Sequence, residues 1–481
     1  MRKRIILNVP PRTWCAFREA VLGARQNGEE VIGFLFCRRH RLSRKALRLF
    51  PVAWVVPMPD CYQSQGVGGL ALRQGFHLEL LRRYGASGLD VVHVHTHPTQ
   101  FRPSFSFTDD MAEARYSRFL SQLPRRPRLV SGVFDTELRD GGFRLWRPDG
   151  TVSADRVLFS AEWLPKRQDG CPSLVPAEQF DRQRVFGRGF QQTLGQLRVG
   201  LVGCGGIGAC FAEQLSRLGV RRWVLIDPDH LETSNLNRLP AATQDMVDDR
   251  WTKVHYVRHL IRLAWPQATE VCTFDVSVQD RDAQAELAKC DLILAATDNH
   301  YSRMVCQETA LRFSRPLISL GTHVEAPKEG GAFRILCRVT APPLGGGWCL
   351  MCGDVIDANR ASLETAAPQI ASDVAKAGYV PGVPAPAVYW VNNCCASLGV
   401  YVIHGALCGM LDVADGVDWV VDFHSMNWLK IGHEARNDCL YCAANDGAAP
   451  ADTCVRTESP ELDTSPAVEQ SASPANPGPD G

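Results

Sequence analysis

Hydrophobic and polar positions first form one block of alternating strand and helix patterns. Trp14, Phe17 and Val21 recur at helical spacing, and the apolar run VIGFLFC (31–37) is typical of a buried strand. The pattern predicts further strands at 53–56, 91–94, 129–134 and 143–146, and helices at 70–84 and 109–120. This alternation indicates an α/β domain over residues 1–160.

A second, longer block of the same kind covers residues 177–442, after a turn-rich linker at 161–176. It opens with the apolar strand LRVGLV (197–202), a glycine-rich turn and a helix over 209–218. The segment YWVNNCCASLGVYVI (389–403) is typical of a buried helix. The pattern predicts a second α/β domain with a Rossmann-like sheet.

The last 39 residues, 443–481, differ from both blocks. They contain six prolines, and seven acidic side chains against Arg456 alone, so we expect a disordered tail. The whole chain of 481 residues has 52 basic and 52 acidic side chains, which leaves +6 on the body and −6 on the tail. This balance argues against a nucleic-acid partner bound through a basic field. No uninterrupted apolar run reaches about 18 residues, so we expect no membrane span.

Eighteen cysteines would suggest disulfides in a small secreted protein. This chain is long, and its first residues, MRKRIILNVPPRTW, lack an apolar signal core. The sequence therefore predicts a cytoplasmic protein whose thiols are free or bound to metal.

A candidate hydrolytic site follows the strand at 91–94. His95 and His97 are two residues apart at a strand end, so their side chains point the same way. Two imidazoles and one carboxylate are a common ligand set for catalytic zinc, which lowers the pKa of water. His93 extends the alternation, and a surface strand that carries three histidines is the alternative.

The full pattern is more specific than the histidine pair. Glu30-Val-Ile-Gly-Phe-Leu, His95-Thr-His97-Pro and Ser106-x-x-Asp109 resemble, in order and spacing, the JAMM motif of the JAB/MPN metalloproteases. The resemblance implies that His95, His97 and Asp109 bind zinc, that Glu30 is the general acid/base, and that Ser106 holds the oxyanion. It also implies hydrolysis of an amide or isopeptide bond after a ubiquitin-like tail.

The second block carries a candidate nucleotide site. Glycines between a strand and a helix let the backbone approach a phosphate, and an acid after the next strand accepts hydrogen bonds from a ribose. Arginine, lysine and a carboxylate further along fit neutralisation of phosphate charge and Mg²⁺ binding better than they fit hydride transfer, so a NAD-dependent oxidoreductase is the weaker alternative. These candidates are Gly203, Gly205, Gly206, Gly208, Asp227, Asp229, Asn235, Arg238, Lys253 and Asp298.

This set resembles the ThiF/MoeB/ubiquitin-activating family over residues 180–442. The resemblance implies ATP- and Mg²⁺-dependent adenylation of the C-terminal carboxylate of a ubiquitin-like or sulfur-carrier protein. It also implies a homodimer in which Arg182 reaches the partner's ATP site.

Two C-x-x-C pairs, Cys349/Cys352 and Cys439/Cys442, predict a structural four-thiolate zinc site that matches the zinc knuckle of this family. Residues 353–393 contain no cysteine, although relatives that form a thioester carry one there. Cys394 and Cys395 fit a buried helix, and Cys204 fits packing. The adenylate could instead pass to a separate thiol acceptor or conjugating enzyme, or to a hydroxyl. The candidate hydroxyls are Ser362, Thr365 and Ser372.

The sequence as a whole predicts one protein that adenylates and hydrolyses at the tail of a shared small protein partner. Sulfur-carrier activation for thiamine, molybdopterin or cysteine synthesis is the nearest alternative, and a non-catalytic scaffold is a further one.

Overall fold

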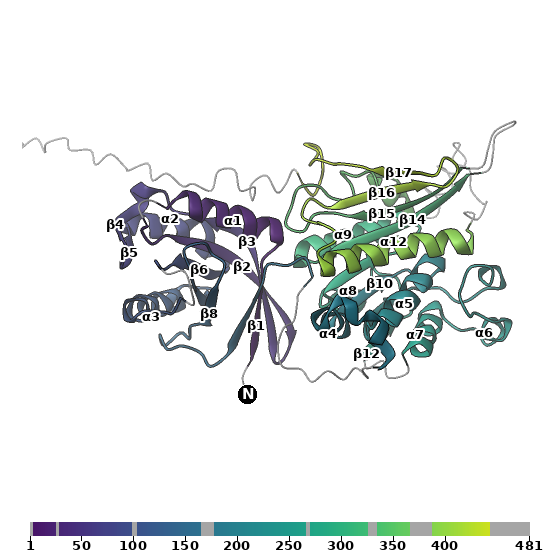
Figure 1. Ribbon diagram of the computed structural model, residues 1–481, viewed down its shortest axis with the longest axis horizontal. Helices are drawn as coiled ribbons and strands as arrows, with labels where there is room; N and C mark the ends of the chain where they lie inside the picture. Colours follow the sequence, from purple (N-terminus) through teal and green to yellow (C-terminus); the bar gives the residue numbers. More distant parts are fainter. Residues whose placement is uncertain are drawn as a thin grey trace, which may run out of the picture.

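The computed structural model describes residues 3–25, 28–98, 103–164, 178–265, 270–325, 334–365 and 387–442. Figure 1 shows two α/β units side by side, each built around its own sheet. Most of the expected linker, the expected disordered tail at 443–481 and Ser372 lie outside the described residues.

The first unit is a seven-stranded sheet in the order β8-β7-β6-β2-β3-β1-β9. The alternation of side chains on its central strand explains how both faces are covered. Leu35 packs into a core with Phe17 of α1, whereas Phe34 packs into a second core with Phe76 of α2. The elements are β1 (Arg4–Asn8), α1 (Pro11–Gly23), β2 (Ile32–Ser43), β3 (Ala46–Val55), α2 (Gln74–Tyr84), β6 (Asp90–Thr96), α3 (Phe107–Gln122), β7 (Leu129–Phe134), β8 (Gly141–Leu145) and β9 (Arg156–Ser160).

The prediction of a helix over 70–84 places the start of the helix too early. Residues Gly69–Leu72 form the strand β5, which pairs with β4 (Tyr62–Gly66), and α2 starts only at Gln74. The hairpin register places Leu72 opposite Tyr62, where both side chains are buried. Tertiary pairing therefore overrides the helical spacing of the leucines.

The second unit is an eight-stranded sheet in the order β12-β11-β10-β13-β14-β15-β16-β17. Its first five strands are parallel, and the order reverses on either side of β10, as in a Rossmann-like fold. This confirms the mixed α/β expectation. The strands are β10 (Arg198–Val202), β11 (Arg222–Ile226), β12 (Glu270–Phe274), β13 (Leu292–Ala295), β14 (Leu317–Glu325), β15 (Arg334–Ala341), β16 (Val417–Asp422) and β17 (Asn427–Lys430).

Helices flank this sheet, and the long apolar α12 packs against α5, β14 and β15 (Figure 1). Among the described residues, α12 is the one helix long and apolar enough to cross a membrane, and half of its most apolar stretch is buried inside the fold. A buried core helix has the same composition. The helices used below are α5 (Gly206–Leu218), α7 (Lys253–Ala264), α8 (Arg281–Leu287), α9 (His300–Phe313), α10 (Ala358–Glu364) and α12 (Tyr389–Cys408).

A buried ion pair joins the two units. Arg48 on β3 lies 2.6 Å from Asp291, which precedes β13, and both side chains are at most 2% exposed. The other carboxylate oxygen of Asp291 accepts a hydrogen bond from the backbone of Arg198 at 3.1 Å. The rings of His40 and Phe313 lie 4.6 Å apart across the same boundary.

Candidate functional site

Two histidines of the first unit converge on one carboxylate. His95 lies near the end of β6 and His97 just beyond it, and each Nε2 atom is 3.3 Å from a different oxygen of Asp109. The two Nε2 atoms are 3.2 Å apart. Ligand atoms of all three residues lie within 4.8 Å of one another, a spacing that fits a shared metal ion.

Asp109 is held in place by the start of α3. Ser106 is the N-cap, and its hydroxyl accepts a hydrogen bond from the backbone N–H of Asp109 at 3.2 Å. In return, the carboxylate of Asp109 accepts one from the N–H of Ser106 at 2.6 Å. This capping box fixes the direction of the carboxylate toward the histidines. Burial opposes ionisation of Asp109, but hydrogen bonds from His95 and His97 hold its pKa well below the usual range.

Glu30 is brought to the same place by strand register. The backbone of Val31, next to it, hydrogen bonds to Thr96, and Ile32 pairs with His95. Glu30 is therefore level with His97 and is 7% exposed. Burial raises the pKa of its carboxyl, His97 opposes that shift and Asp109 adds to it. A carboxyl with a raised pKa can take up and return a proton.

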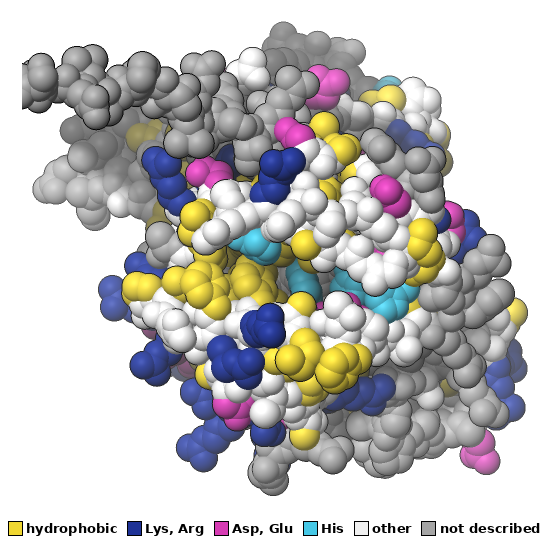
Figure 2. Space-filling model, turned by 90° about the vertical axis from the view of Figure 1, so that its left-hand side faces the viewer, with side chains coloured by type: hydrophobic (Ala, Val, Ile, Leu, Met, Phe, Trp, Pro, Cys, Tyr) yellow, Lys and Arg dark blue, Asp and Glu magenta, His cyan; other side chains and the backbone are white. Residues whose placement is uncertain are grey.

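His93 does not lie on a surface strand, so that alternative is wrong. It is 7% exposed, and its Nε2 lies 3.2 Å from Glu113. Glu113 also accepts hydrogen bonds from Arg144 and from the Trp146 indole, both at 2.9 Å. Sequence reasoning missed Glu113 and Arg144, because no motif connects them to the histidines. Figure 2 looks onto this side of the molecule, where histidine side chains lie in a hollow beside exposed hydrophobic ones.

The glycine turn of the second unit follows β10 and begins α5. Gly203 has a φ of +92°, and a Cβ atom there would lie 2.5 Å from the carbonyl oxygen of Ala296. A Cβ atom on Gly208 would lie 1.9 Å from the oxygen of Gly203, whereas one on Gly205 would meet nothing within 4 Å. A side chain at Gly203 or Gly208 would therefore collide with the backbone, whereas one at Gly205 would enter open space. Gly206 faces Asn392 of α12, a residue that the sequence did not indicate.

The carboxylate of Asp227 contacts the backbone of this turn. It accepts hydrogen bonds from the backbone of Cys204 at 2.7 Å and of Asp229 at 2.9 Å. Burial raises its pKa, and Lys253 opposes the shift. Cys204 is fully buried, in agreement with a packing role.

A pocket of about 820 Å³ is lined by Arg238, whose Cδ atom would lie 3.4 Å from a Cβ atom on Gly206 of this turn. Lys253, the first residue of α7, donates a hydrogen bond to Asp229 at 2.7 Å. Burial lowers the pKa of Lys253, but Asp229, Asp227 and Asp298 outweigh that effect and raise it, so the ammonium stays charged. Four of the predicted residues line the pocket, namely Asp229, Asn235, Arg238 and Lys253.

The other seven predicted nucleotide-site residues are not among those that line the pocket. They are the four glycines of the turn, Asp227, Asp298 and Arg182. Asp298 is exposed three residues beyond the end of β13, although its charge acts on Lys253. Arg182 is exposed on a short 3-10 helix (Glu178–Phe186) and does not line the pocket of its own chain.

The four paired cysteines come together although 90 residues separate the pairs. Cys349 Sγ lies 3.8 Å from that of Cys352 and 3.5 Å from that of Cys439, and Cys352 lies 3.6 Å from Cys442. All four sulfurs fall within 4.8 Å of one another. The backbone N–H of Arg436 donates to Cys352 at 3.4 Å. A hydrogen bond from Cys442 lowers the pKa of Cys349, which favours the thiolate that a metal needs.

Cys394 and Cys395 lie on α12. Cys395 is fully buried and Cys394 is partly buried, and burial contributes to the raised pKa of both thiols. Hydrogen bonding with Cys337 is the largest cause for Cys395. The hydroxyls of Ser362 and Thr365 donate to backbone carbonyls at 2.9 Å at the end of α10. None of these four groups lines the pocket.

Comparison with known protein families gives a match for the second unit. The ThiF family model matches residues 178–366. This segment is a ThiF family domain. The match lies wholly within the second unit and contains the glycine turn and the pocket cations.

Curated relatives of the chain have related names. It is 28% identical to ubiquitin-like modifier-activating enzyme 5 of Caenorhabditis briggsae over 212 residues, which is 40% of this chain and 48% of that protein. It is 26% identical to the sulfur carrier protein ThiS adenylyltransferase of Bacillus subtilis, over 36% of this chain and 53% of that protein. The chain thus spans about half the length of these relatives.

Solved structures with a similar arrangement include Escherichia coli MccB with ATP. It has a TM-score of 0.42 and 17% identity, and the match covers 56% of this chain and 76% of that one.

Proposed function

We propose that the ThiF domain adenylates the C-terminal carboxylate of a ubiquitin-like or sulfur-carrier protein. The carboxylate would attack the α-phosphorus of ATP, the bond to the β-phosphate would break, and pyrophosphate would leave with its electron pair. The observation that carries this proposal is the pocket that Lys253 and Arg238 line, since Arg238 also lies against Gly206 of the glycine turn. Two cations there fit the charge that develops on pyrophosphate.

The remaining residues of the site have distinct tasks in this reaction. Gly205 leaves room for a phosphate, and Asp227 and Asp229 fit hydrogen bonding to the ribose or Mg²⁺. The carboxylate of Asp298, next to Lys253, suits Mg²⁺, which would screen the phosphate charges. Arg182 would complete the site of a second subunit, so we propose a homodimer.

The proposal for the N-terminal domain is zinc-dependent hydrolysis of a peptide or isopeptide bond, as in JAB/MPN proteins. Two imidazoles and one carboxylate within 4.8 Å suit Zn²⁺ and leave a fourth position open. Bound there, Zn²⁺ would act as a Lewis acid. Glu30 would move the proton from water to the leaving amine, and Ser106 would steady the carbonyl oxygen.

Both activities fit one small protein partner, whose tail would be trimmed or released by one domain and activated by the other. The four clustered cysteines suit a structural Zn²⁺ ion. A cytoplasmic location is part of this proposal. The adenylate would pass to a separate thiol acceptor or conjugating enzyme, because the two thiols of α12 lie outside the pocket.

A pyrophosphate assay tests the adenylation proposal. The full chain is incubated with ATP and a ubiquitin-like protein encoded beside its gene, and pyrophosphate release and a mass increase by AMP are followed. We expect both to require the partner and to be lost in Asp298→Ala. A folded protein without activity on any such partner would refute the proposal.

A cleavage assay tests the hydrolase proposal independently. The substrate is the same ubiquitin-like protein with a short C-terminal extension. Glu30→Gln should abolish cleavage, whereas Glu29→Gln, one residue away and partly exposed, should retain it. Equal loss in both variants would contradict the role of Glu30.

The product separates the remaining functions. A thiocarboxylate on the partner would favour sulfur transfer, and a covalent protein adduct would favour conjugation. Full biological function in Glu30→Gln and Asp298→Ala would favour a scaffold. Tight NAD binding without ATP binding would favour an oxidoreductase.

A further inference from the structure

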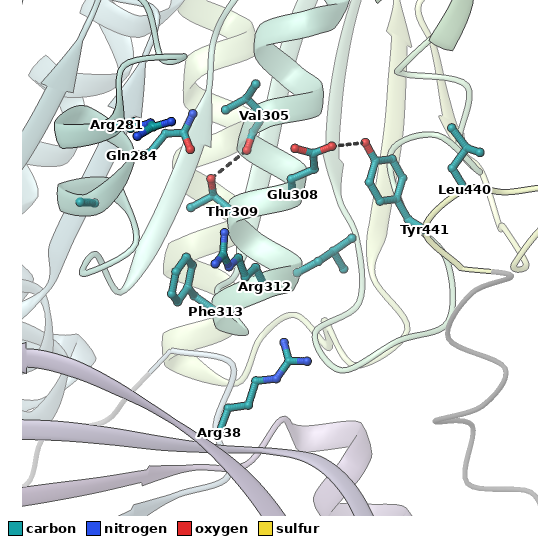
Figure 3. Close-up of a pocket in the computed structure, with 12 residues that line it drawn as sticks. Arg38, Arg281, Gln284, Val305, Glu308, Thr309, Arg312, Phe313, Leu440 and Tyr441 are labelled. Atoms are coloured by element: carbon teal, nitrogen blue, oxygen red, sulfur yellow. Dashed lines mark hydrogen bonds between the residues drawn. The ribbon is translucent and has the colours of Figure 1, made fainter. Parts of the chain in front are cut away.

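A second pocket, of about 780 Å³, is lined by residues of both units (Figure 3). Arg38 comes from β2 of the first unit, whereas Arg281 of α8 and Arg312 of α9 come from the ThiF domain. In Figure 3, Arg38 points from its strand toward the helix that carries Arg312. The pocket shares no lining residue with either set of predicted catalytic residues.

The pocket has an excess of positive charge. Glu308 is the one acidic residue among those that line it, and it accepts a hydrogen bond from the Tyr441 hydroxyl at 2.8 Å. No ion pair within the described part of the chain involves the three arginines. Three guanidinium groups on one concave surface favour a ligand with several carboxylates.

The chain itself carries such a ligand at the required place. Leu440 and Tyr441 line the pocket, and the acidic segment 443–481 begins two residues later. Its first acid, Asp446, is five residues from Tyr441, a distance that an extended chain spans with about 17 Å. Tethering gives such a segment an effective concentration on the order of millimolar.

We propose that the acidic segment 443–481 binds in cis to the arginine pocket formed by Arg38, Arg281 and Arg312. The segment then links the two units by charge, because its carboxylates pair with arginines from both. Its net charge of −6 complements the +6 of the rest of the chain.

Trypsin provides a direct test with the full chain. Arg456 is the only Lys or Arg in the segment, so release of the peptide 457–481, followed by mass spectrometry, reports access to it. We expect release to be about tenfold faster in Arg281→Glu/Arg312→Glu than in the unmodified protein, the combined effect of a few exposed ion pairs. High salt or added hexaglutamate should accelerate release in the unmodified protein only.

Two further variants make the result decisive. Arg44→Glu/Arg262→Glu carries the same charge change on exposed residues outside the pocket and should leave the release rate unchanged. Replacing the seven acids of 443–481 by Asn or Gln leaves the folded units intact and should accelerate release as the pocket variant does. The proposal would be overturned by equal release rates in three proteins: the unmodified protein, Arg281→Glu/Arg312→Glu, and the variant without the seven acids.

Discussion

The side-chain amide of Asn392 lies where a Cβ atom of residue 206 would be: Nδ2 is 2.3 Å from that position. Asn392 is 2% exposed, and its carbonyl oxygen accepts a hydrogen bond from Thr322 at 3.3 Å. The glycine turn is thus packed from behind by α12, and a larger side chain at position 206 would disturb this packing.

This relationship predicts opposite effects of two neighbouring substitutions. Gly206→Ala should lower the free energy of unfolding by about 1–3 kcal/mol, because the buried Asn392 has little room to move. Gly205→Ala should change it by less than about 0.5 kcal/mol, since a Cβ there meets nothing within 4 Å, but should abolish ATP binding. Thermal unfolding and nucleotide titration measure the two properties. Normal ATP binding by Gly205→Ala would contradict the assigned phosphate site.

Lys253 is the cation expected to act on the leaving pyrophosphate. Lys253→Met should reduce adenylation about 100-fold or more, because a charge near the reacting phosphates is lost. Its partner Asp229 is largely exposed, so stability should hardly change. Lys289→Met, which removes a lysine paired with Glu286 outside the pocket, serves as the control and should keep full activity. The rate of pyrophosphate release gives the comparison.

The parts of the site that could be predicted are those that are local in sequence. The Gly203–Gly208 turn and the Ser106/Asp109 capping box each span six residues or fewer, so spacing alone determines their geometry. The neighbours that complete them could not be predicted. Asn392 reaches Gly206 only after the chain has crossed the sheet, and Glu113 meets Arg144 only through the packing of α3 on the sheet.

The same distinction applies to the fold. The apolar run 197–202 predicted the buried parallel strand β10 (Arg198–Val202) within one residue, because burial on both faces leaves a continuous signal. The strand β1, which lies between β3 and β9, and the hairpin of β4 and β5 were missed. Their stability comes from pairing with strands far along the chain or from a hairpin register, and neither leaves a pattern in the segment itself.

The two metal-ligand sets predict a zinc stoichiometry that can be dissected. The purified chain should contain about two zinc ions, one at the clustered thiols and one at the histidines. Cys439→Ser should remove one ion and lower the melting temperature, because a structural ion contributes directly to folding. His95→Ala should remove the other ion. Cys290→Ser, at a buried thiol outside the cluster, should lose neither, and elemental analysis measures all three.

The lowered pKa of Glu113 predicts how the stability of the N-terminal domain changes with pH. Burial would raise its pKa, but His93, Ser131 and Arg144 lower it to about 2 from the ordinary 4.5. A carboxyl whose pKa is lower in the folded state stabilises the fold above about pH 4.5 and loses that contribution as the pH falls toward 2. The contribution is roughly 3 kcal/mol, so Glu113→Gln should unfold more easily at pH 7 by up to that amount. The difference from the unmodified protein should shrink steadily below pH 4.5.

The control is Glu79→Gln, on the exposed side of α2, which should match the unmodified protein at every pH. Denaturant titrations across the pH range test both variants. A difference for Glu113→Gln that stays constant down to pH 2 would show that its charge does not stabilise the fold.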